Sequence, residues 1–120
     1  MKTTIYHADK TLTSIQPGAD WSSVYEELSK LNLMVFGGRV YIVGVGGLLL
    51  SGGNSLYSTA RGFACDGVAN FQVVLANGSI VSASADENAD LYRVLKGGSN
   101  NFGIVTRFDL NTFKAPATLW

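Results

Sequence analysis

Apolar and polar residues alternate over two short stretches at the start of the chain. Residues 3–8 and 11–16 are rich in Thr, Ile and Tyr, and the polar pair Asp9 and Lys10 separates them. β-Branched and aromatic side chains fit a pleated, half-buried surface. The pattern therefore predicts a small β-hairpin that ends at Pro17.

A helical pattern follows the predicted hairpin. Asp20 is a residue type that caps helix N-termini well, and the apolar residues after it recur at intervals of three and four. We expect an amphipathic helix that ends at Asn32, followed by a short buried strand over residues 33–36. The predicted core stripe of the helix is Trp21, Val24, Tyr25, Leu28 and Leu31.

The middle of the chain has no clean hydrophobic period. Residues 43–54 combine glycine clusters with a run of leucines, and this is consistent with a short helical turn between two glycine clusters. Residues 55–67 show neither alternation nor a helical stripe, so we expect a loop there.

Alternation returns over residues 68–76 and predicts a strand. Asn77 and Gly78 are typical of a type I′ hairpin turn, after which residues 79–85 are expected to run back as a second strand. The predicted inward face of the first strand is Phe71, Val73 and Leu75.

The last third of the chain predicts one helix and one strand. The helix covers residues 88–96, with Leu91, Val94 and Leu95 inward, and Gly97 suits the position after its end. The strand covers residues 104–110, and its predicted shared face is Ile104, Thr106, Phe108 and Leu110. Strands and helices in this order indicate an α+β fold.

Composition excludes several classes of protein. The 120 residues suit one domain or part of one, and with 47% hydrophobic residues they can fill a core. The formal net charge is zero and the longest apolar run is residues 40–50, so we expect no nucleic-acid partner and no membrane span. With one cysteine and one histidine, we expect no disulfide within the chain and no metal site. The compartment stays open.

Seven glycines between residues 37 and 53 need a physical reason. Glycine lets a ligand approach the backbone, and successive exposed N–H groups bind anions such as a pyrophosphate. A tight loop in a strained connection is an equally good explanation. The dinucleotide pattern G-x-G-x-x-G fails because Leu49 stands at the third glycine position, and the P-loop pattern fails because no lysine is near.

Four blocks of the sequence, taken in their order along the chain, together resemble one protein family. They are the glycine-rich run with Val-Gly-Val-Gly-Gly at 43–47, Arg-Gly-Phe-Ala-Cys-Asp at 61–66, Val-Val-Leu-Ala-Asn-Gly at 73–78, and the stretch from Asp-Leu-Tyr at 90–92 to Asn-Phe-Gly-Ile-Val-Thr at 101–106. Together they cover nearly the whole chain. The chain resembles the PCMH-type FAD-binding domain of the vanillyl-alcohol-oxidase superfamily, in its berberine-bridge-enzyme-like branch.

The resemblance implies an architecture and a function. It implies a partial domain with a mostly antiparallel sheet and flanking helices: residues 1–38 would end a first FAD subdomain, 39–115 would form the second, and 116–120 would begin the link to a substrate domain. The intact parent would be an FAD-dependent oxidoreductase that takes hydride from alcohols, sugars or related C–H substrates, with oxygen as acceptor. The chain alone is expected to be inactive.

The resemblance also implies which residues contact FAD, mostly through the backbone. No catalytic residue is implied in this chain. Two alternatives stay open, a non-catalytic remnant of the same fold and a cofactor-free binding module with structural glycines. The implied cofactor residues are Gly38, then Gly44, Gly46 and Gly47 against the cofactor with Val43 beside them, Gly52, Gly53 and Asn54 on the flavin's ribityl side, and Gly103, Ile104 and Val105 at the cofactor's other end.

The chain departs from the family pattern at both covalent flavin anchors. Val40 stands where some members carry the cysteine, and the chain has no Gly-Gly-His. His7 lies on a predicted strand, and Cys65 is expected to be a small buried residue. If parts of the domain are missing, core aromatics would be left half-covered, and the candidates are Trp21, Phe71 and Phe108.

Overall fold

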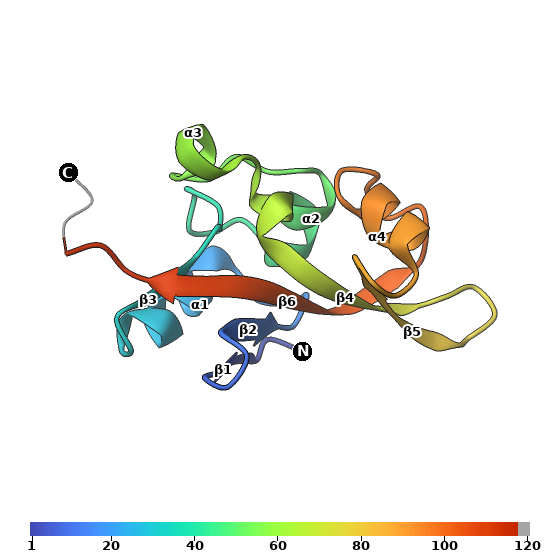
Figure 1. Cartoon of the computed structure of the whole chain (residues 1–120), viewed down its shortest axis with the longest axis horizontal. Helices are drawn as coiled ribbons and strands as arrows, with labels where there is room; N and C mark the ends of the chain where they lie inside the picture. Colours follow the sequence, from blue (N-terminus) through green and yellow to red (C-terminus); the bar gives the residue numbers. More distant parts are fainter. Residues whose placement is uncertain (118–120) are drawn as a thin grey trace.

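One antiparallel sheet runs through the whole molecule (Figure 1). The computed structural model describes residues 1–117. Within them the strand order is β1-β2-β6-β4-β5, and β3 pairs with the far end of β6. All pairings are antiparallel, as expected. The strands are β1 (Thr4–His7), β2 (Leu12–Ile15), β3 (Leu33–Val35), β4 (Val68–Val74), β5 (Ile80–Ser84) and β6 (Ile104–Lys114).

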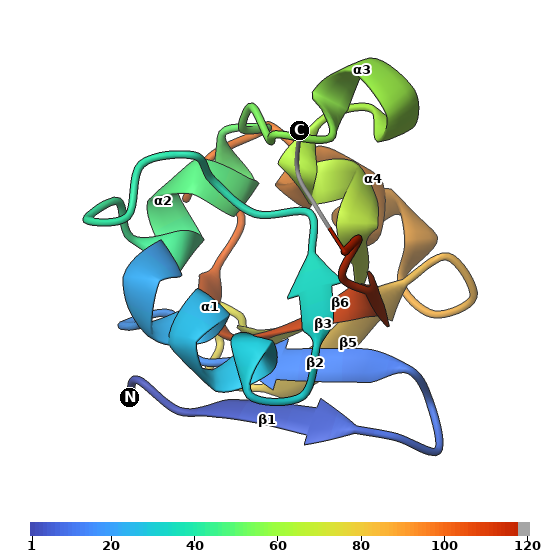
Figure 2. The same ribbon diagram turned by 90° about the vertical axis from the view of Figure 1, so that its left-hand side faces the viewer.

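Short helices cover the sheet. In Figure 1, α2, α3 and α4 lie above β4 and β6, while the β1–β2 hairpin lies below them, and Figure 2 shows α1 beside α2 at one end. Residues 55–67, which were predicted to be a loop, contain two short helical elements of four residues each, so that prediction was wrong. Four residues are too few to show a hydrophobic period. The helices are α1 (Trp21–Ser29), α2 (Val45–Leu50), α3 (Ser58–Arg61) and α4 (Ala89–Leu95), with a 3-10 turn, η1 (Ala64–Gly67).

Helix α1 begins where its cap was predicted. The Asp20 carboxylate accepts a hydrogen bond from the Ser23 N–H at 2.9 Å, and this bond holds the pKa of Asp20 below its usual value. Leu31 was wrongly placed in the core stripe. The helix ends at Ser29 and Asn32 turns into the left-handed region, so the Leu31 side chain lies beyond the helix and is exposed.

A β-bulge changes the phase of β6. Gln72 of β4 pairs with Arg107, but the next residue, Val73, pairs with Val105. The extra residue on β6 shifts the alternation by one position. Val105 is therefore buried and Ile104 is 70% exposed, so the prediction that Ile104 shares a face with Phe108 was wrong.

The β4–β5 turn is not the predicted type I′ turn. Type I′ needs positive φ at both central residues, whereas only Gly78 of the pair has it. The Gly78 N–H donates to the Leu75 carbonyl, and the Leu75 N–H donates to the Ser79 carbonyl, each at 2.9 Å. This is a three-residue loop in which the Asn77 carboxamide accepts the Ser79 N–H at 3.0 Å.

The inner face of helix α4 contains Tyr92, whereas Val94 was predicted to point inward. Val94 is exposed. The Tyr92 ring instead packs on Phe71, with 5.9 Å between ring centroids, and its hydroxyl donates to the Val68 carbonyl at 2.6 Å. Gly97 follows the helix with φ of +107°, as expected for its end.

The core is continuous across both predicted subdomains. Trp21, Phe71 and Phe108 are completely buried, so the prediction that they are half-covered was wrong. β2 pairs directly with β6, so the sheet crosses the predicted boundary at residue 38, and the division itself stays a prediction. Residues 118–120 of the predicted link lie outside the described residues. No helix in the described part of the chain is long and apolar enough to cross a membrane.

Candidate functional site

The glycine-rich run forms α2 and the two loops that flank it. Val45 and Leu49 are buried and anchor the helix to the core. The Val45 N–H also donates to the Ala19 carbonyl at 2.9 Å, which fixes the start of α2 beside α1. The expected helical turn between glycine clusters is therefore confirmed, and it carries its glycines on a firmly anchored element.

The glycines of this run differ in what surrounds them. A Cβ on Gly46 would lie in ordinary contact with Pro17 and Phe108, at 3.6 to 3.8 Å, so this residue faces inward. A Cβ on Gly44 or Gly47 would meet nothing within 4 Å. Neither of these two has a positive φ, and both are exposed. Nothing within the described chain requires glycine at these two positions.

Other predicted site glycines are required by the fold itself. A Cβ on Gly38 would lie 2.7 Å from the Trp21 indole. Gly53 has φ of +76° and would place a Cβ 2.5 Å from Leu48, and Gly103 has φ of +149°. Such backbone favours glycine. For these three positions the explanation as a tight connection is sufficient, whereas the two open glycines described above have no such explanation.

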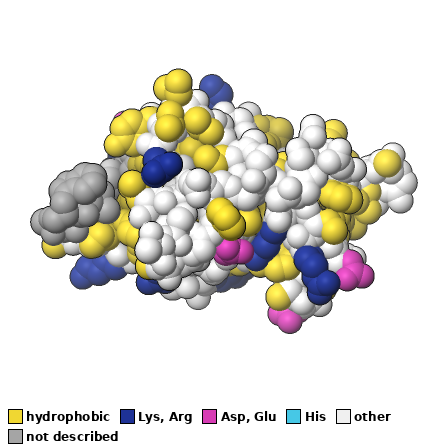
Figure 3. Space-filling model, turned by 90° about the horizontal axis from the view of Figure 1, so that it is seen from above, with side chains coloured by type: hydrophobic (Ala, Val, Ile, Leu, Met, Phe, Trp, Pro, Cys, Tyr) yellow, Lys and Arg dark blue, Asp and Glu magenta, His cyan; other side chains and the backbone are white. Residues whose placement is uncertain are grey.

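An exposed apolar loop precedes α2. Val40, Tyr41 and Ile42 follow one another on the surface, and Ile42 is 87% exposed. Figure 3 views the molecule from the side of α2, α3 and α4 and shows several apolar patches, with scattered Lys and Arg side chains and a group of charged side chains of both signs toward one end. Neither Tyr41 nor Ile42 was predicted from the sequence to be a site residue. Three consecutive apolar residues without strand alternation are the signal that could have identified them.

The third predicted group of site residues lies at the start of β6. The Ser99 N–H donates to the Leu50 carbonyl at 2.9 Å, so the loop before β6 is fixed to the end of α2. Ile104 is exposed, whereas Val105 is buried and offers only its backbone. The structure thus brings the loop before Gly103 to α2, next to the loop that contains Gly52, Gly53 and Asn54.

One hollow of about 360 Å³ lies between α1 and the apolar loop, and its lining includes Tyr41. Others lie away from the glycine-rich run. One of about 340 Å³ lies between β5 and α4, and its lining includes Tyr92 and Lys96. Another of about 150 Å³ lies on the bare face of the sheet, lined in part by His7 and Asp109. The glycine-rich run lies on an open face.

Comparison with known proteins decides the family. Residues 1–84 match the FAD binding domain family. The chain belongs to this family. The FAD-dependent monooxygenase tpcD of Cochliobolus heterostrophus is 55% identical over 108 residues, which are 90% of this chain and 21% of that protein. The chain thus spans about a fifth of the length of this relative.

Solved structures share the fold of this FAD binding domain. The glucooligosaccharide oxidase of Acremonium strictum is 37% identical with a TM-score of 0.90, over 98% of this chain and 24% of that chain. A BBE-like protein of Physcomitrella patens is 30% identical with a TM-score of 0.90, over 97% of this chain and 26% of that chain. The expected PCMH-type, berberine-bridge-enzyme-like fold is confirmed, and FAD is the cofactor of the family.

The exposed face of this FAD binding domain suits the cofactor. Gly44 and Gly47 leave the backbone open to close approach by a ligand, and the apolar loop at residues 40–42 offers a surface for a flat aromatic ring system. A flavin nucleotide combines such a ring with a polar chain and a pyrophosphate. The residues present therefore fit the group.

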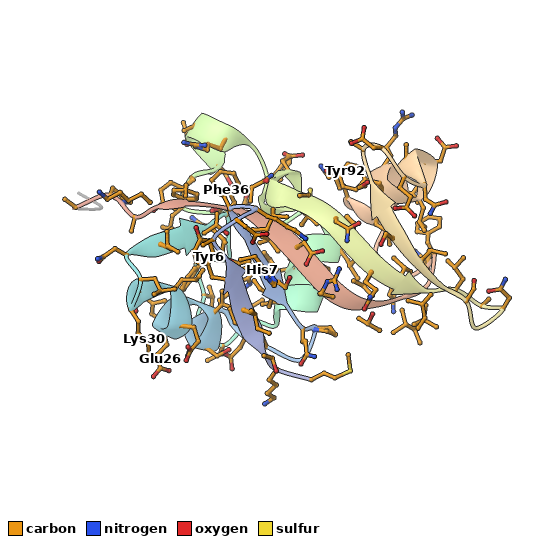
Figure 4. The ribbon with its side chains drawn as sticks, turned by 60° about the horizontal axis from the view of Figure 1, so that its bottom comes forward. Tyr6, His7, Glu26, Lys30, Phe36 and Tyr92 are labelled. Atoms are coloured by element: carbon orange, nitrogen blue, oxygen red, sulfur yellow. The ribbon has the colours of Figure 1, made fainter. Side chains whose placement is uncertain are left out.

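The histidine and the cysteine of the chain are both held by hydrogen bonds within the fold. The His7 side chain lies on β1 (Figure 4), and its Nε2 is 3.0 Å from the Ser14 hydroxyl. Cys65 is buried in η1, as expected, and its N–H donates to the Gly52 carbonyl at 2.9 Å. Val40, at the position of the family's cysteine, is exposed in the apolar loop.

The Cys65 thiol is expected to be inert while the chain is folded. Burial, and next the charge of Asp66, raise the pKa of this thiol, and only the thiolate reacts with alkylating agents. At neutral pH, iodoacetamide should modify the folded chain at least about tenfold more slowly than the chain in urea. Mass spectrometry of timed samples measures both rates, and equal rates would contradict this burial.

Proposed function

We propose that this chain forms the FAD-binding part of an FAD-dependent oxidoreductase. The finer proposal is that the intact enzyme oxidises an alcohol, a sugar or a related C–H group. When bound, the flavin supplies a hydride acceptor that oxygen can reoxidise. The family match and the oxidases of the same fold support this proposal.

The chain's own residues would bind and orient the cofactor. Val43, Gly44 and Gly47 would lie against the flavin, with the loop of Gly52, Gly53 and Asn54 beside its ribityl chain. Gly103, Ile104 and Val105 would offer backbone to the other end. The contacts would be made mainly by main-chain atoms, so small residues are expected there. No side chain of this set is a proton donor or acceptor suited to catalysis, so the substrate's proton would be taken elsewhere in the enzyme.

The observation that carries the proposal is the pair Gly44 and Gly47. Glycine within a helix costs about 0.5–1 kcal/mol relative to alanine. Gly47 lies within α2, yet neither packing nor backbone conformation requires it. A ligand that must approach the backbone closely is a physical reason for glycine at such a position.

Two neighbouring alanine substitutions test this explanation. Gly47→Ala adds a methyl group on the open side of α2, and Gly46→Ala adds one on the inner side, in ordinary contact with Pro17 and Phe108. Both should raise the free energy of unfolding by about 0.5–1 kcal/mol in the absence of FAD. Only Gly47→Ala should weaken FAD binding, by about tenfold or more, which corresponds to about 1.4 kcal/mol.

Thermal melts without FAD and titrations followed by flavin fluorescence measure the two effects. Stabilisation of both variants together with weakened binding by Gly47→Ala alone is the expected result. A wild-type chain that stays colourless and takes up no FAD would overturn the proposal in favour of a cofactor-free module. Equal FAD affinity for Gly47→Ala and wild type would show that α2 does not contact the cofactor.

A further inference from the structure

We propose that Tyr25 is a positioning residue for FAD, because its hydroxyl holds the loop that carries the exposed apolar residues 40–42. The proposal rests on the proposed function. Tyr25 lies on α1 and does not need to touch the cofactor itself. Its hydroxyl donates a hydrogen bond of 2.7 Å to the carbonyl of Gly38, at the point where the loop begins.

Three groups of α1 hold carbonyls of this one loop. The Trp21 N–H donates to the Val43 carbonyl at 3.2 Å, and the Ser22 N–H donates to the Tyr41 carbonyl at 3.0 Å. The Tyr25 hydroxyl holds the Gly38 carbonyl. We call these three residues the α1 clamp. Because these carbonyls face α1, the clamp fixes which side of the loop faces outward.

The two main-chain bonds of the clamp come with the fold of α1, but the third depends on one side chain. The first N–H groups of any helix need partners outside the helix, so Trp21 and Ser22 would serve this purpose whatever their side chains. Only the bond from Tyr25 is specific to the residue type. It can therefore be removed by deleting one oxygen atom.

Packing leaves little room for the loop to shift on α1. The Trp21 and Tyr25 rings stack with 5.8 Å between centroids, and the Tyr41 ring meets the Tyr25 ring edge-on at 6.4 Å. A Cβ on Gly37 would collide with both the Trp21 ring and the Tyr25 hydroxyl. The absence of side chains at Gly37 and Gly38 lets the backbone lie directly on this aromatic pair.

The Tyr25 hydroxyl remains a donor throughout the accessible pH range. Burial, with a further contribution from the nearby Tyr57 and Tyr41, raises the pKa of Tyr25 well above its usual value. The protonated phenol is the only form that can donate to a carbonyl. The clamp is therefore expected to hold at every pH at which the chain is folded.

The chain contains a matched control for Tyr25. The Tyr92 hydroxyl donates to the Val68 carbonyl at 2.6 Å, so it makes the same type of bond in a partly buried place. Tyr92 lies on α4, away from α1, which Glu26 and Lys30 mark in Figure 4. Tyr25→Phe and Tyr92→Phe remove one equivalent bond each.

The experiment compares wild type and the two phenylalanine variants of the 120-residue chain. Hydrogen exchange without FAD measures how firmly the loop at residues 39–44 is held, and FAD titration measures affinity and the visible absorption band of the bound flavin. We expect Tyr25→Phe to speed exchange of the loop and to weaken FAD binding, each by about tenfold. We also expect it to shift the flavin band. Tyr92→Phe should change none of these.

The outcomes separate the two proposals. If wild type binds FAD and both variants bind it equally well, the positioning role of Tyr25 is overturned. If exchange of the loop is unchanged in Tyr25→Phe, it is overturned as well, with or without FAD. If wild type binds no FAD, the proposed function is overturned, and the positioning role of Tyr25 is overturned with it. The two variants can lose equal thermal stability while only Tyr25→Phe changes loop exchange and FAD affinity. That result supports the positioning role of Tyr25, because a general loss of stability would affect both variants alike.

Discussion

Replacement of Phe108 by alanine is expected to lower the free energy of unfolding by about 3–5 kcal/mol, a large fraction of the total stability of a small domain. Phe108 is completely buried on β6. Its ring packs against Phe71 with 5.7 Å between centroids, and its outer edge lies under Gly46 of α2. Truncation would leave a cavity directly beneath the helix that carries the open glycines.

The matched control is Ile104→Ala on the same strand. Simple alternation puts Ile104 and Phe108 on one face, but the bulge leaves Ile104 70% exposed. We expect a change within about 0.5 kcal/mol, as for other surface substitutions. Urea unfolding followed by far-UV circular dichroism measures both variants. Similar losses for the two substitutions would show that the bulge and the inward position of Phe108 are misplaced.

The sequence predicted best where one local signal decides the structure. Asp20 caps α1 through a single hydrogen bond to Ser23, and the hairpin of β1 and β2 follows from alternation alone. Gly97 ends α4 because a positive φ is needed there. Each of these features depends on residues within a few positions of one another.

The errors arose where distant residues decide. The bulge in β6 depends on its register against β4, more than thirty residues earlier in the chain, and no pattern within residues 104–110 reveals it. Tyr92 replaces Val94 on the inner side of α4 because Phe71 and the Val68 carbonyl offer it a ring contact and an acceptor. Neither the ring contact nor the hydrogen bond can be predicted from the hydrophobic periodicity of the helix itself.

The candidate site was predictable as a segment but not residue by residue. The glycine-rich run pointed to a ligand or to a tight loop, and the structure explains some of its glycines by the tight connection and leaves others without a reason in packing or backbone conformation. Gly38 and Gly53 avoid collisions with Trp21 and Leu48, whereas Gly44 and Gly47 avoid none. This distinction depends on which atoms surround the position that a Cβ would occupy at each glycine, and these atoms are known only from the structure. The clamp by Tyr25 was missed for the same reason, since its ring follows the core stripe and only its hydroxyl reaches the loop.

A buried carboxylate joins three strands on the face of the sheet opposite the helices. Asp109 of β6 is only 6% exposed. It accepts hydrogen bonds from the Ser14 hydroxyl of β2 at 2.6 Å and from the Asn70 side-chain amide of β4 at 2.8 Å. The Arg107 guanidinium donates to it at 3.1 Å and forms an ion pair with it. This arrangement satisfies both oxygens and fixes the relative position of the central strands.

Replacement of Asp109 by alanine is therefore expected to cost about 2–3 kcal/mol of unfolding free energy. A buried donor left without an acceptor costs about 1–3 kcal/mol. Ser14 and Asn70 would both lose Asp109 as acceptor, and because both are only half-buried, each loss lies at the low end of this range. The Arg107 side chain is 40% exposed, so water can replace part of its pairing and its share of the loss is small.

The isosteric variant Asp109→Asn separates the hydrogen bonds from the volume of the side chain. Its amide oxygen can still accept from one donor, but its NH₂ group cannot accept from the other, so we expect a loss between those of wild type and alanine. Exposed Asp86 supplies the control, because Asp86→Ala should change stability by less than about 0.5 kcal/mol. The midpoints of urea unfolding at pH 7 rank wild type and the three variants by stability. If Asp109→Ala ranks with Asp86→Ala, the carboxylate does not hold the strands together, and their alignment depends on the apolar face alone.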